Sequence, residues 1–427
     1  MQNPSVHNKN RVLVVGTTPD YIHWIRENHP DRSVFITDPR ARQKAAEPKP
    51  SAEEEILVRL ESHVVVLSTL FSHLETHGMA LTGVVCFDCE SLELAAAISS
   101  VFDFEFVSVE TVRNCRDKLV SKQIWQKNGI PCPKTRPVNF LDDALAFFKE
   151  CRSGIVLKPF YGSGSELVFR CKTEAECETS FTIIKEGLEK RRSNPIFKKL
   201  SSTEHLMLAE EFKAGSEFSC DILVDGDTFT IIRTAKKFKL SNQPFGTVAG
   251  YILPAALPAG IKRDSFKSLL LKSARVLGIK RAICMVDFIV SNQKVSLIEL
   301  TPRPGGDCLP SLLKTAGDID IIGMALDIAE KKEILVNGTD NIPVHIGLRI
   351  HAQKAGILQG FNTDDLATEK RIKSIQFIRE PGHRITMPPS DYDSWLLGHM
   401  IIKPESEKYM EAQSLLIRQR LNVDIAS

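Results

Sequence analysis

The sequence predicts an α/β fold, with a parallel sheet near the N-terminus and β-hairpins further along the chain. An apolar run at 11–16 ends in glycine, and a helical pattern at 21–28 and a strand pattern at 33–37 follow it, which begins a βαβ unit. Later, two pairs of apolar segments are each joined by turn-forming residues, which predicts two hairpins. The 427 residues exceed what one hydrophobic core usually supports, so we expect several structural units.

The first unit is predicted to be a Rossmann-like α/β domain over residues 1–110. A helical stretch at 51–76 precedes a strand at 83–87, which extends the parallel sheet. Gly16 stands alone where a dinucleotide-binding turn would show G-x-G-x-x-G. A nucleotide site in this domain is therefore not favoured.

The central region is predicted to begin with one helix. Apolar residues recur at helical spacing between 112 and 125, and Gly129 and Pro131 then provide a stop. The elements expected after it are the strand 155–158, the helix 174–190, the strand 206–209, a hairpin of 218–224 and 228–232, the helix 265–277, and a second hairpin of 284–290 and 295–300. Beyond residue 329, a strand at 345–351, several short strands and a helix near 405–421 predict a C-terminal α+β unit.

The composition excludes several classes of protein. With 55 Lys plus Arg against 53 Asp plus Glu, spread along the chain, nucleic acid is not an expected partner. The polar segment Met1–Asn10 lacks the apolar core of a signal peptide, and the apolar runs are far shorter than the roughly 20 residues that cross a bilayer, so no membrane span is expected. Cys86 and Cys89 have C-x-x-C spacing, but no second pair has it, and ten scattered cysteines fit a reducing cytoplasm.

The second hairpin carries the sharpest chemical signal. If its turn occupies residues 291–295, Val290 pairs with Ser296 and Asp287 lies directly across from Glu299. Cross-strand Cβ atoms are roughly 4.5–5.5 Å apart, and like charges at that distance are destabilising unless something neutralises them. Mg²⁺ prefers hard oxygen ligands, commonly one or two carboxylates plus phosphate oxygens. The pattern therefore predicts a magnesium site at this carboxylate pair.

The strand alternation is predicted to continue beyond Glu299. With a period of two, Glu299, Thr301 and Arg303 point to the same face, so Arg303 is expected beside the metal, where a guanidinium suits phosphoryl or carboxylate charge. The alternative is an exposed hairpin whose acidic residues are only solvated, because a register slip of one residue reverses the two faces.

Two further segments suit a nucleotide. In Lys158-Pro-Phe-Tyr-Gly-Ser-Gly-Ser165 a lysine at a strand end precedes a loop rich in glycine and hydroxyls, which can wrap phosphates with backbone N–H groups. In the segment 206–217 an apolar strand runs into an acidic turn, whose backbone could meet an adenine edge and whose Glu217 could accept from ribose hydroxyls. Each segment alone would also fit a plain surface turn.

Taken together and in this order, these motifs resemble the ATP-grasp superfamily, and within it the carboxylate-amine ligases that include L-amino-acid ligases. The resemblance covers about residues 110–330. It implies an N-terminal domain over 1–110, an ATP-grasp domain over 111–330 with lobes 111–205 and 206–330, and a C-terminal unit over 331–427. Glu166 stands where the family commonly has Gly, and Thr301 where it usually has Asn.

The resemblance also implies roles for residues of this chain. Asp117-Lys118 looks like the first ATP lysine, Lys158 like the second, and Tyr161 to Ser165 like the phosphate flap. The residues implied to bind ATP are Lys118, Lys158, Ser163, Gly164, Ser165, Glu210, Glu211, Phe212, Lys213 and Glu217. The implied metal ligands are Asp287 and Glu299, with Thr301 in doubt, and the implied catalytic residues are Lys158 and Arg303.

The implied activity is an ADP-forming ligase that uses ATP and Mg (or Mn) to activate a carboxylate as an acyl phosphate and joins it to an amine. Two alternatives remain from the residues: an ATP-dependent carboxylase or phosphotransferase, and a non-catalytic nucleotide-binding regulatory protein. The partners expected are a small-molecule carboxylate and an amine. The sequence leaves their identity open, and it leaves open the oligomeric state, for which a homodimer is one alternative.

Overall fold

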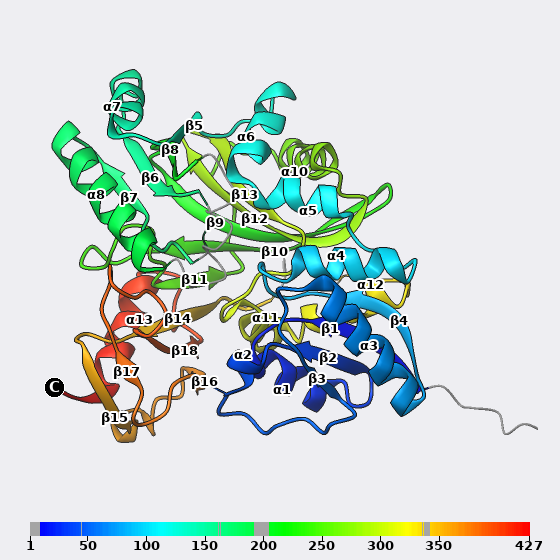
Figure 1. Ribbon diagram of the computed structural model, residues 1–427. Coiled ribbons are helices and arrows are strands. Elements are labelled where there is room, and N and C mark those ends of the chain that lie inside the picture. The colour runs from blue at the N-terminus through cyan, green and yellow to red at the C-terminus, as the bar shows by residue number, and fades with distance from the viewer. Residues whose placement is uncertain are drawn as a thin grey trace, which may run out of the picture.

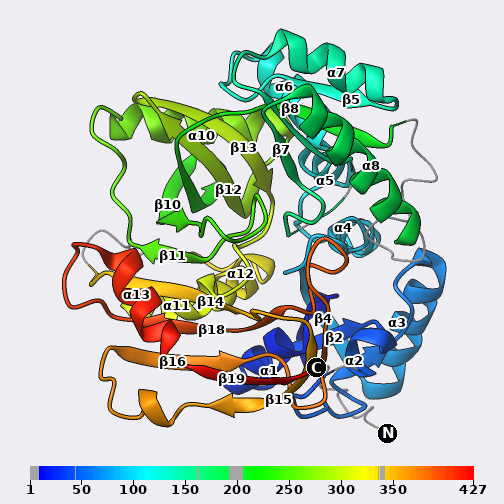
Figure 2. The same cartoon turned by 90° about the vertical axis from the view of Figure 1, so that its left-hand side faces the viewer.

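The computed structural model describes residues 9–43, 45–160, 162, 164–191, 205–334, 336 and 342–427. Four sheets organise these residues, with strand orders β3-β2-β1-β4, β5-β8-β6-β7, β13-β12-β9-β10-β11-β14-β18-β16 and β17-β15-β19. Figures 1 and 2 show the first sheet in the lower part of the molecule and the second at the top beside helices α7 and α8, and the long third sheet runs from β13, near the second sheet, down to β16, at the level of the first sheet.

The N-terminal sheet is parallel throughout, as predicted. Its strands are β1 Lys9–Val15, β2 Ser33–Thr37, β3 Glu55–Leu57 and β4 Met79–Val85, and its helices are α1 Pro19–Asn28, α2 Pro39–Gln43, α3 His63–His77 and α4 Leu92–Val101. The predicted helix over 51–76 is wrong in its first part, because residues 55–57 pair with β2 and the helix begins after its N-cap Ser62. Ser62 caps the helix by accepting from Val65 N.

The single helix predicted across 112–125 is two helices, α5 Val109–Arg116 and α6 Lys118–Lys127. Asp117 separates them with an extended backbone, and its side chain accepts from Leu119 N and Val120 N as the N-cap of α6. The break matters for the site because it puts Lys118 at the first position of a new helix.

The second sheet is antiparallel and is covered by two helices. Its elements are β5 Thr135–Val138, α7 Leu141–Glu150, β6 Ile155–Pro159, β7 Phe169–Cys171, α8 Glu174–Lys190 and β8 Met207–Glu211. A core of its own, formed by residues such as Phe147, Leu157 and Ile184, joins the helices to the sheet. Lys158 and Glu210 lie on adjacent antiparallel strands, β6 and β8, where Lys158 pairs with Leu208 and Glu210 pairs with Val156.

The third sheet is the longest and is antiparallel. Its elements are β9 Ser216–Asp225, β10 Thr228–Phe238, β11 Gly250–Leu253, α10 Arg263–Leu277, β12 Arg281–Ser291, β13 Lys294–Thr301, α11 Leu309–Gly317, α12 Ile321–Ala329, β14 His345–His351, β16 Ile372–Phe377 and β18 Leu396–Ile402. Because β11 pairs with β14, the predicted C-terminal strands continue this sheet.

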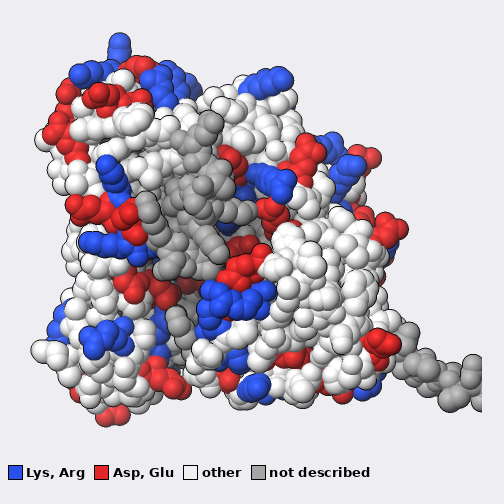
Figure 3. All heavy atoms as spheres, in the orientation of Figure 1, with Lys and Arg blue, Asp and Glu red and all other residues white. Residues whose placement is uncertain are grey.

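The remaining elements form the small sheet at the C-terminus. They are β15 Gly356–Asn362, the 3₁₀ helix η3 Asp364–Leu366, β17 Arg384–Ile385, α13 Met410–Gln419 and β19 Asn422–Ala426. None of the helices in the described ranges is long and apolar enough to cross a bilayer. On the face shown in Figure 3, basic and acidic side chains are interspersed.

Candidate active site

The predicted carboxylate pair forms, although the register differs from the predicted one. Asp287 on β12 pairs with Glu299 on β13, as expected. The turn is shorter than predicted, because Asn292 and Gln293 both adopt left-handed backbone angles and Val290 pairs with Val295. A bulge between Asp287 and Phe288 shifts the register by one residue and restores the facing carboxylates.

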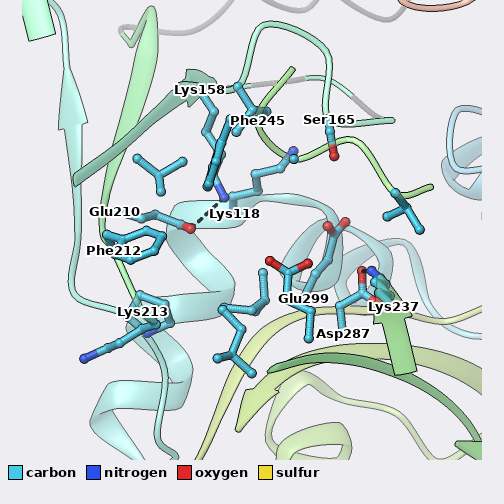
Figure 4. Close-up of a pocket in the computed structure, with 18 of the residues that line it drawn as sticks. Lys118, Lys158, Ser165, Glu210, Phe212, Lys213, Lys237, Phe245, Asp287 and Glu299 are labelled. Atoms are coloured by element: carbon cyan, nitrogen blue, oxygen red, sulfur yellow. Dashed lines mark hydrogen bonds and ion pairs between the residues drawn. The ribbon is translucent and has the colours of Figure 1, made fainter. Parts of the chain in front are cut away.

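The carboxylate pair borders a cleft between the second and third sheets. The predicted residues that line this cleft are Lys118, Lys158, Gly164, Ser165, Glu210, Glu211, Phe212, Lys213, Glu217, Asp287 and Glu299. Figure 4 shows Glu210, Phe212 and Lys213 at one end of the cleft and Asp287 with Glu299 at the other. The structure therefore brings together residues that lie up to 181 positions apart in the sequence, from Lys118 to Glu299.

Two lysines share one carboxylate at the inner side of the cleft. Lys122 Nζ lies 2.8 Å from Glu210 Oε1, and Lys158 Nζ lies 2.8 Å from Glu210 Oε2. Burial alone would raise the pKa of Glu210, but Lys122 and Lys158 outweigh it and lower that pKa to about 2. Burial, together with the charges of Lys122 and Lys118, lowers the pKa of Lys158 to about 8. Glu210 is therefore ionised and held from two sides.

Lys118 connects the start of α6 to the flap. Its Nζ donates to the backbone oxygen of Gly162 over 3.0 Å. Burial would raise the pKa of Glu299, but the charges of Lys118 and Lys158 outweigh it and hold that pKa below its usual value. The cationic side of the cleft thus keeps the opposite carboxylate ionised.

Asp287 is suited to bind a cation. Its Oδ2 accepts from Lys237 Nζ over 2.5 Å, whereas its Oδ1 is buried and has no hydrogen-bond partner among the described residues. A buried carboxylate oxygen without a partner is costly, and a hard cation would satisfy it. Across the described part of the chain, no group of three or more His, Cys, Asp and Glu could hold a metal. The residues therefore fit Mg²⁺ only as a two-carboxylate set completed by phosphate oxygens.

Aromatic and charged side chains form the other end of the cleft. Arg170 lies over the ring of Phe212, with its Cζ 3.5 Å from the ring centroid. Phe245 lies 6.3 Å from Phe212, centroid to centroid. Glu217 is paired with Lys239. This end combines a flat aromatic surface with an acidic group, which suits a base and a sugar.

The flap is tied to two other parts of the molecule. Glu166 accepts from Arg191 Nε, and Arg191 Nη2 donates to the backbone oxygens of Pro389 (2.9 Å) and Ser390 (2.7 Å). Glu166, which departs from the family pattern, therefore has a partner that the sequence did not indicate. Tyr161 and Ser163 of the predicted flap lie outside the described residues.

Thr301 and Arg303 are not among the described residues that line the cleft. Thr301 is buried at the end of β13, and Arg303 N donates to Thr301 O, so the strand alternation ends there. The Arg303 guanidinium instead contacts Cys89 Sγ, at 3.2 Å from Nε and 3.0 Å from Nη2. The expectation that all three side chains share one face is therefore not met, because the backbone turns after Thr301.

The sequence interpretation missed three lysines, Lys122, Lys237 and Lys239. Lys122 lies one helical turn after Lys118, so i, i+4 spacing on one helix could have indicated it. Lys237 and Lys239 both line the cleft and are two residues apart, as strand alternation requires. They were missed because β10 runs to Phe238, six residues beyond the predicted strand end at 232.

Residues 151–311 match the family model described as "ATP-grasp domain". This segment of the chain is therefore similar to ATP-grasp domains. An L-amino acid ligase from Bacillus licheniformis has a similar fold to the whole chain, with a TM-score of 0.76, 18% identity, and coverage of 98% of this chain and 99% of that one. The likeness in fold therefore includes the regions on both sides of the family match.

Relatives of this chain include two named ligases. A D-alanine--D-alanine ligase of Acidovorax ebreus is 23% identical over 222 residues, covering 50% of this chain and 61% of that relative. An alanine--anticapsin ligase of Bacillus amyloliquefaciens is 24% identical over 324 residues, covering 73% of this chain and 60% of that relative. The chain thus spans about three fifths of the length of these curated relatives.

Proposed function

We propose that this chain is an ADP-forming ligase that phosphorylates a carboxylate with ATP and joins it to an amine. The observation that carries the proposal is the cleft in which Asp287 and Glu299, paired across a hairpin, face Lys118 and Lys158. Two acids and two lysines in one cleft are the charges that in-line phosphoryl transfer requires. The match to the ATP-grasp family model and the names of the two ligase relatives support the same reaction class.

In this proposal the nucleotide lies along the cleft. The adenine packs against Phe212 and meets the backbone of residues 210–213, and the ribose hydroxyls bond to Glu217 in place of Lys239. Lys118 and Lys158 hold the phosphates and spread their negative charge, which develops further during transfer. Gly164 and Ser165 line the same end, so the flap would cover the phosphates.

The proposed metal ligands are Asp287 and Glu299, and the buried, unpartnered Oδ1 of Asp287 supports this assignment. Magnesium, when bound, neutralises charge on the phosphates and orients them for transfer. Thr301 is buried away from the cleft, so we leave it out of the ligand set. Manganese would suit the same oxygen ligands.

The acyl phosphate would form beyond the γ-phosphate, towards Arg303. We keep Arg303 as the proposed residue for this anion, which would replace Cys89 as the partner of its guanidinium. The flap would exclude water from the reactive intermediate, with Glu166 and Arg191 holding it to the rest of the chain. Loss of phosphate then leaves an amide bond to the attacking amine.

We further propose amino acids as the substrates, because both named relatives act on alanine. The proposed arrangement keeps residues 1–110, 111–330 and 331–427 as N-terminal, ATP-grasp and C-terminal units. A cytoplasmic location is proposed because all ten cysteines, each among the described residues, are free thiols.

The test is ADP release by Glu299→Gln and Asp287→Asn in the presence of magnesium and pairs of amino acids. We expect each variant to lose about 100-fold or more in kcat while it unfolds at the wild-type temperature, because the carboxylates act on charge in the transition state. Glu150→Gln is the matched control, since Glu150 is an exposed acid of α7. Hydroxylamine in place of the amine should yield a hydroxamate, which separates an acyl-phosphate former from a simple phosphotransferase.

Near wild-type turnover in both carboxylate variants would show that Asp287 and Glu299 are not the metal ligands of the reaction. Magnesium-independent ATP binding without ADP release in the wild-type chain would favour the regulatory alternative.

A further inference from the structure

Lys122, Glu210 and Lys158 form a trio of charged side chains, and only one of its two lysines lines the cleft. Lys158 lines the cleft, whereas Lys122 lies behind Glu210 and is only 1% exposed. A lysine is almost never fully buried unless it is paired. The pairing here is specific, because each carboxylate oxygen of Glu210 takes one lysine at 2.8 Å.

Lys122 is held in this place by its helix. Asp117 caps the start of α6, and Trp125, one turn after Ser121, is fully buried and donates to the backbone oxygen of Ser273. The side chain of Lys122 therefore leaves a fixed helix and reaches one fixed carboxylate. Lys118, one turn earlier on α6, reaches the flap instead.

The arrangement matters when Lys158 turns towards a ligand. If Glu210 had Lys158 as its one partner, a lysine that moved to a phosphate oxygen would leave a buried carboxylate without a counter-charge, which is strongly unfavourable. With Lys122 on its other oxygen, Glu210 stays paired whether Lys158 points at Glu210 or into the cleft. Lys122 thus lowers the free-energy cost of moving the Lys158 ammonium away from Glu210.

We propose that Lys122 is a positioning residue for nucleotide binding, which keeps Glu210 paired and so frees the Lys158 ammonium for the phosphates. This rests on the proposed function, because it assumes that the cleft takes ATP. Lys122 itself touches no substrate in this inference. It acts on the nucleotide through Glu210 and Lys158.

The inference predicts a change in ATP binding that adenosine binding does not share. Lys122→Met should weaken ATP binding about tenfold, because Glu210 then retains Lys158, and it should change adenosine binding less than about threefold. Lys122→Arg keeps the charge and should bind ATP within about threefold of the wild type. Lys127→Met is the matched control, an exposed lysine on the same helix.

A second readout is the pH dependence of ATP binding. The charged groups facing Lys158 are Glu210, Lys122 and Lys118, with Glu299 across the cleft. Burial and the charges of Lys122 and Lys118 lower the pKa of Lys158 to about 8, so wild-type ATP binding should weaken as pH rises through that value. Without Lys122 that decline should move to higher pH, which a purely structural role of Lys122 would not cause.

The deciding experiment is a double-mutant cycle with Glu210→Gln, measured by calorimetric titration of the full chain with ATP and with adenosine. In the Glu210→Gln background, Lys122→Met should cost less than about threefold in ATP affinity, because no buried carboxylate remains to hold Lys158. The double variant removes both Glu210 and the fully buried Lys122 and leaves Lys158, which lines the cleft, so it keeps the test open if Lys122→Met alone does not fold.

Equal losses from Lys122→Met in both backgrounds, or equal losses for ATP and adenosine, would overturn the inference. If the wild-type chain bound no ATP, the proposed function would fail as well. If the wild type bound ATP and the cycle showed no coupling, the role of Lys122 alone would be wrong.

Discussion

Asp221 and Arg233 form an ion pair that is completely buried, with Oδ2 and Nε 2.6 Å apart and neither side chain exposed. The second oxygen of Asp221 accepts from Gly305 N over 2.9 Å, so the pair also anchors the loop after β13 that carries Arg303. Removing one partner of a buried pair leaves an uncompensated charge. We therefore expect Asp221→Asn to lower the free energy of unfolding by about 3–5 kcal/mol, measured by urea denaturation.

The control for this prediction is the pair of Arg136 and Glu150, whose side chains are 40% and 54% exposed. Arg136→Ala should cost less than about 1 kcal/mol, because exposed ion pairs contribute little. A loss of similar size in the two variants would mean that burial does not determine the strength of the Asp221 pair.

We expect the ion pair between Glu166 and Arg191 to determine how tightly the flap closes. Arg191→Met removes the bonds to Glu166 and to the backbone of Pro389 and Ser390, so water should reach the acyl phosphate more often. We expect the ratio of ADP released to amide formed to rise roughly three- to tenfold. Parallel assays of ADP and product check this, with Arg136→Met as the control, and an unchanged ratio would show that the tie does not limit closure.

The affinities for ATP, ADP and adenosine should distinguish the roles of the two ends of the cleft. Phe212→Ala should weaken ATP, ADP and adenosine alike, by about tenfold, because it removes the aromatic surface proposed for the base. Lys118→Met should weaken ATP and ADP and leave adenosine unchanged. Competition against a fluorescent nucleotide measures all three ligands. An adenosine affinity that falls equally in both variants would mean that the ends of the cleft have been misassigned.

The sequence predicted the elements of the site better than it predicted their exact geometry. Alternation and turn chemistry were enough to put Asp287 across from Glu299, yet the turn was one residue shorter and a bulge compensated. Short-range patterns do not encode a bulge, because the extra residue is accommodated by tertiary packing. The break at Asp117 was missed for a related reason, since apolar spacing continues through it and only the capping geometry reveals it.

Contacts between distant segments could not be predicted from one sequence. Glu210 and Lys122 are 88 residues apart, and Arg191 and Pro389 are 198 apart. No local periodicity relates such pairs, so the buried lysine and the flap tie became visible only in three dimensions. Arg303 shows the converse, because local alternation predicted a position that the turn after Thr301 prevents.

Acid should destabilise the C-terminal part of the chain through His351. Its side chain is 6% exposed, Nδ1 lies 3.2 Å from Gln243 Nε2, and Nε2 has no hydrogen-bond partner in the part of the chain described. Burial, and then the charge of Arg349, lowers the pKa of His351 from 6.5 to about 3. Between these values the unfolded chain binds a proton that the folded chain does not. Stability is therefore complete above about pH 6.5 and falls as the pH drops towards 3.

The size of this effect follows from the pKa difference. At pH 5 the histidine should cost about 2 kcal/mol relative to pH 7, so His351→Gln should lose about that much less stability over the same interval. Urea denaturation of both proteins at pH 7 and pH 5 measures the difference, and all other titrating groups are common to the two proteins. His63→Gln, at an exposed position of α3, is the control. If wild type and His351→Gln lost the same stability, the folded chain would have to accommodate a charged His351, against the burial that surrounds it.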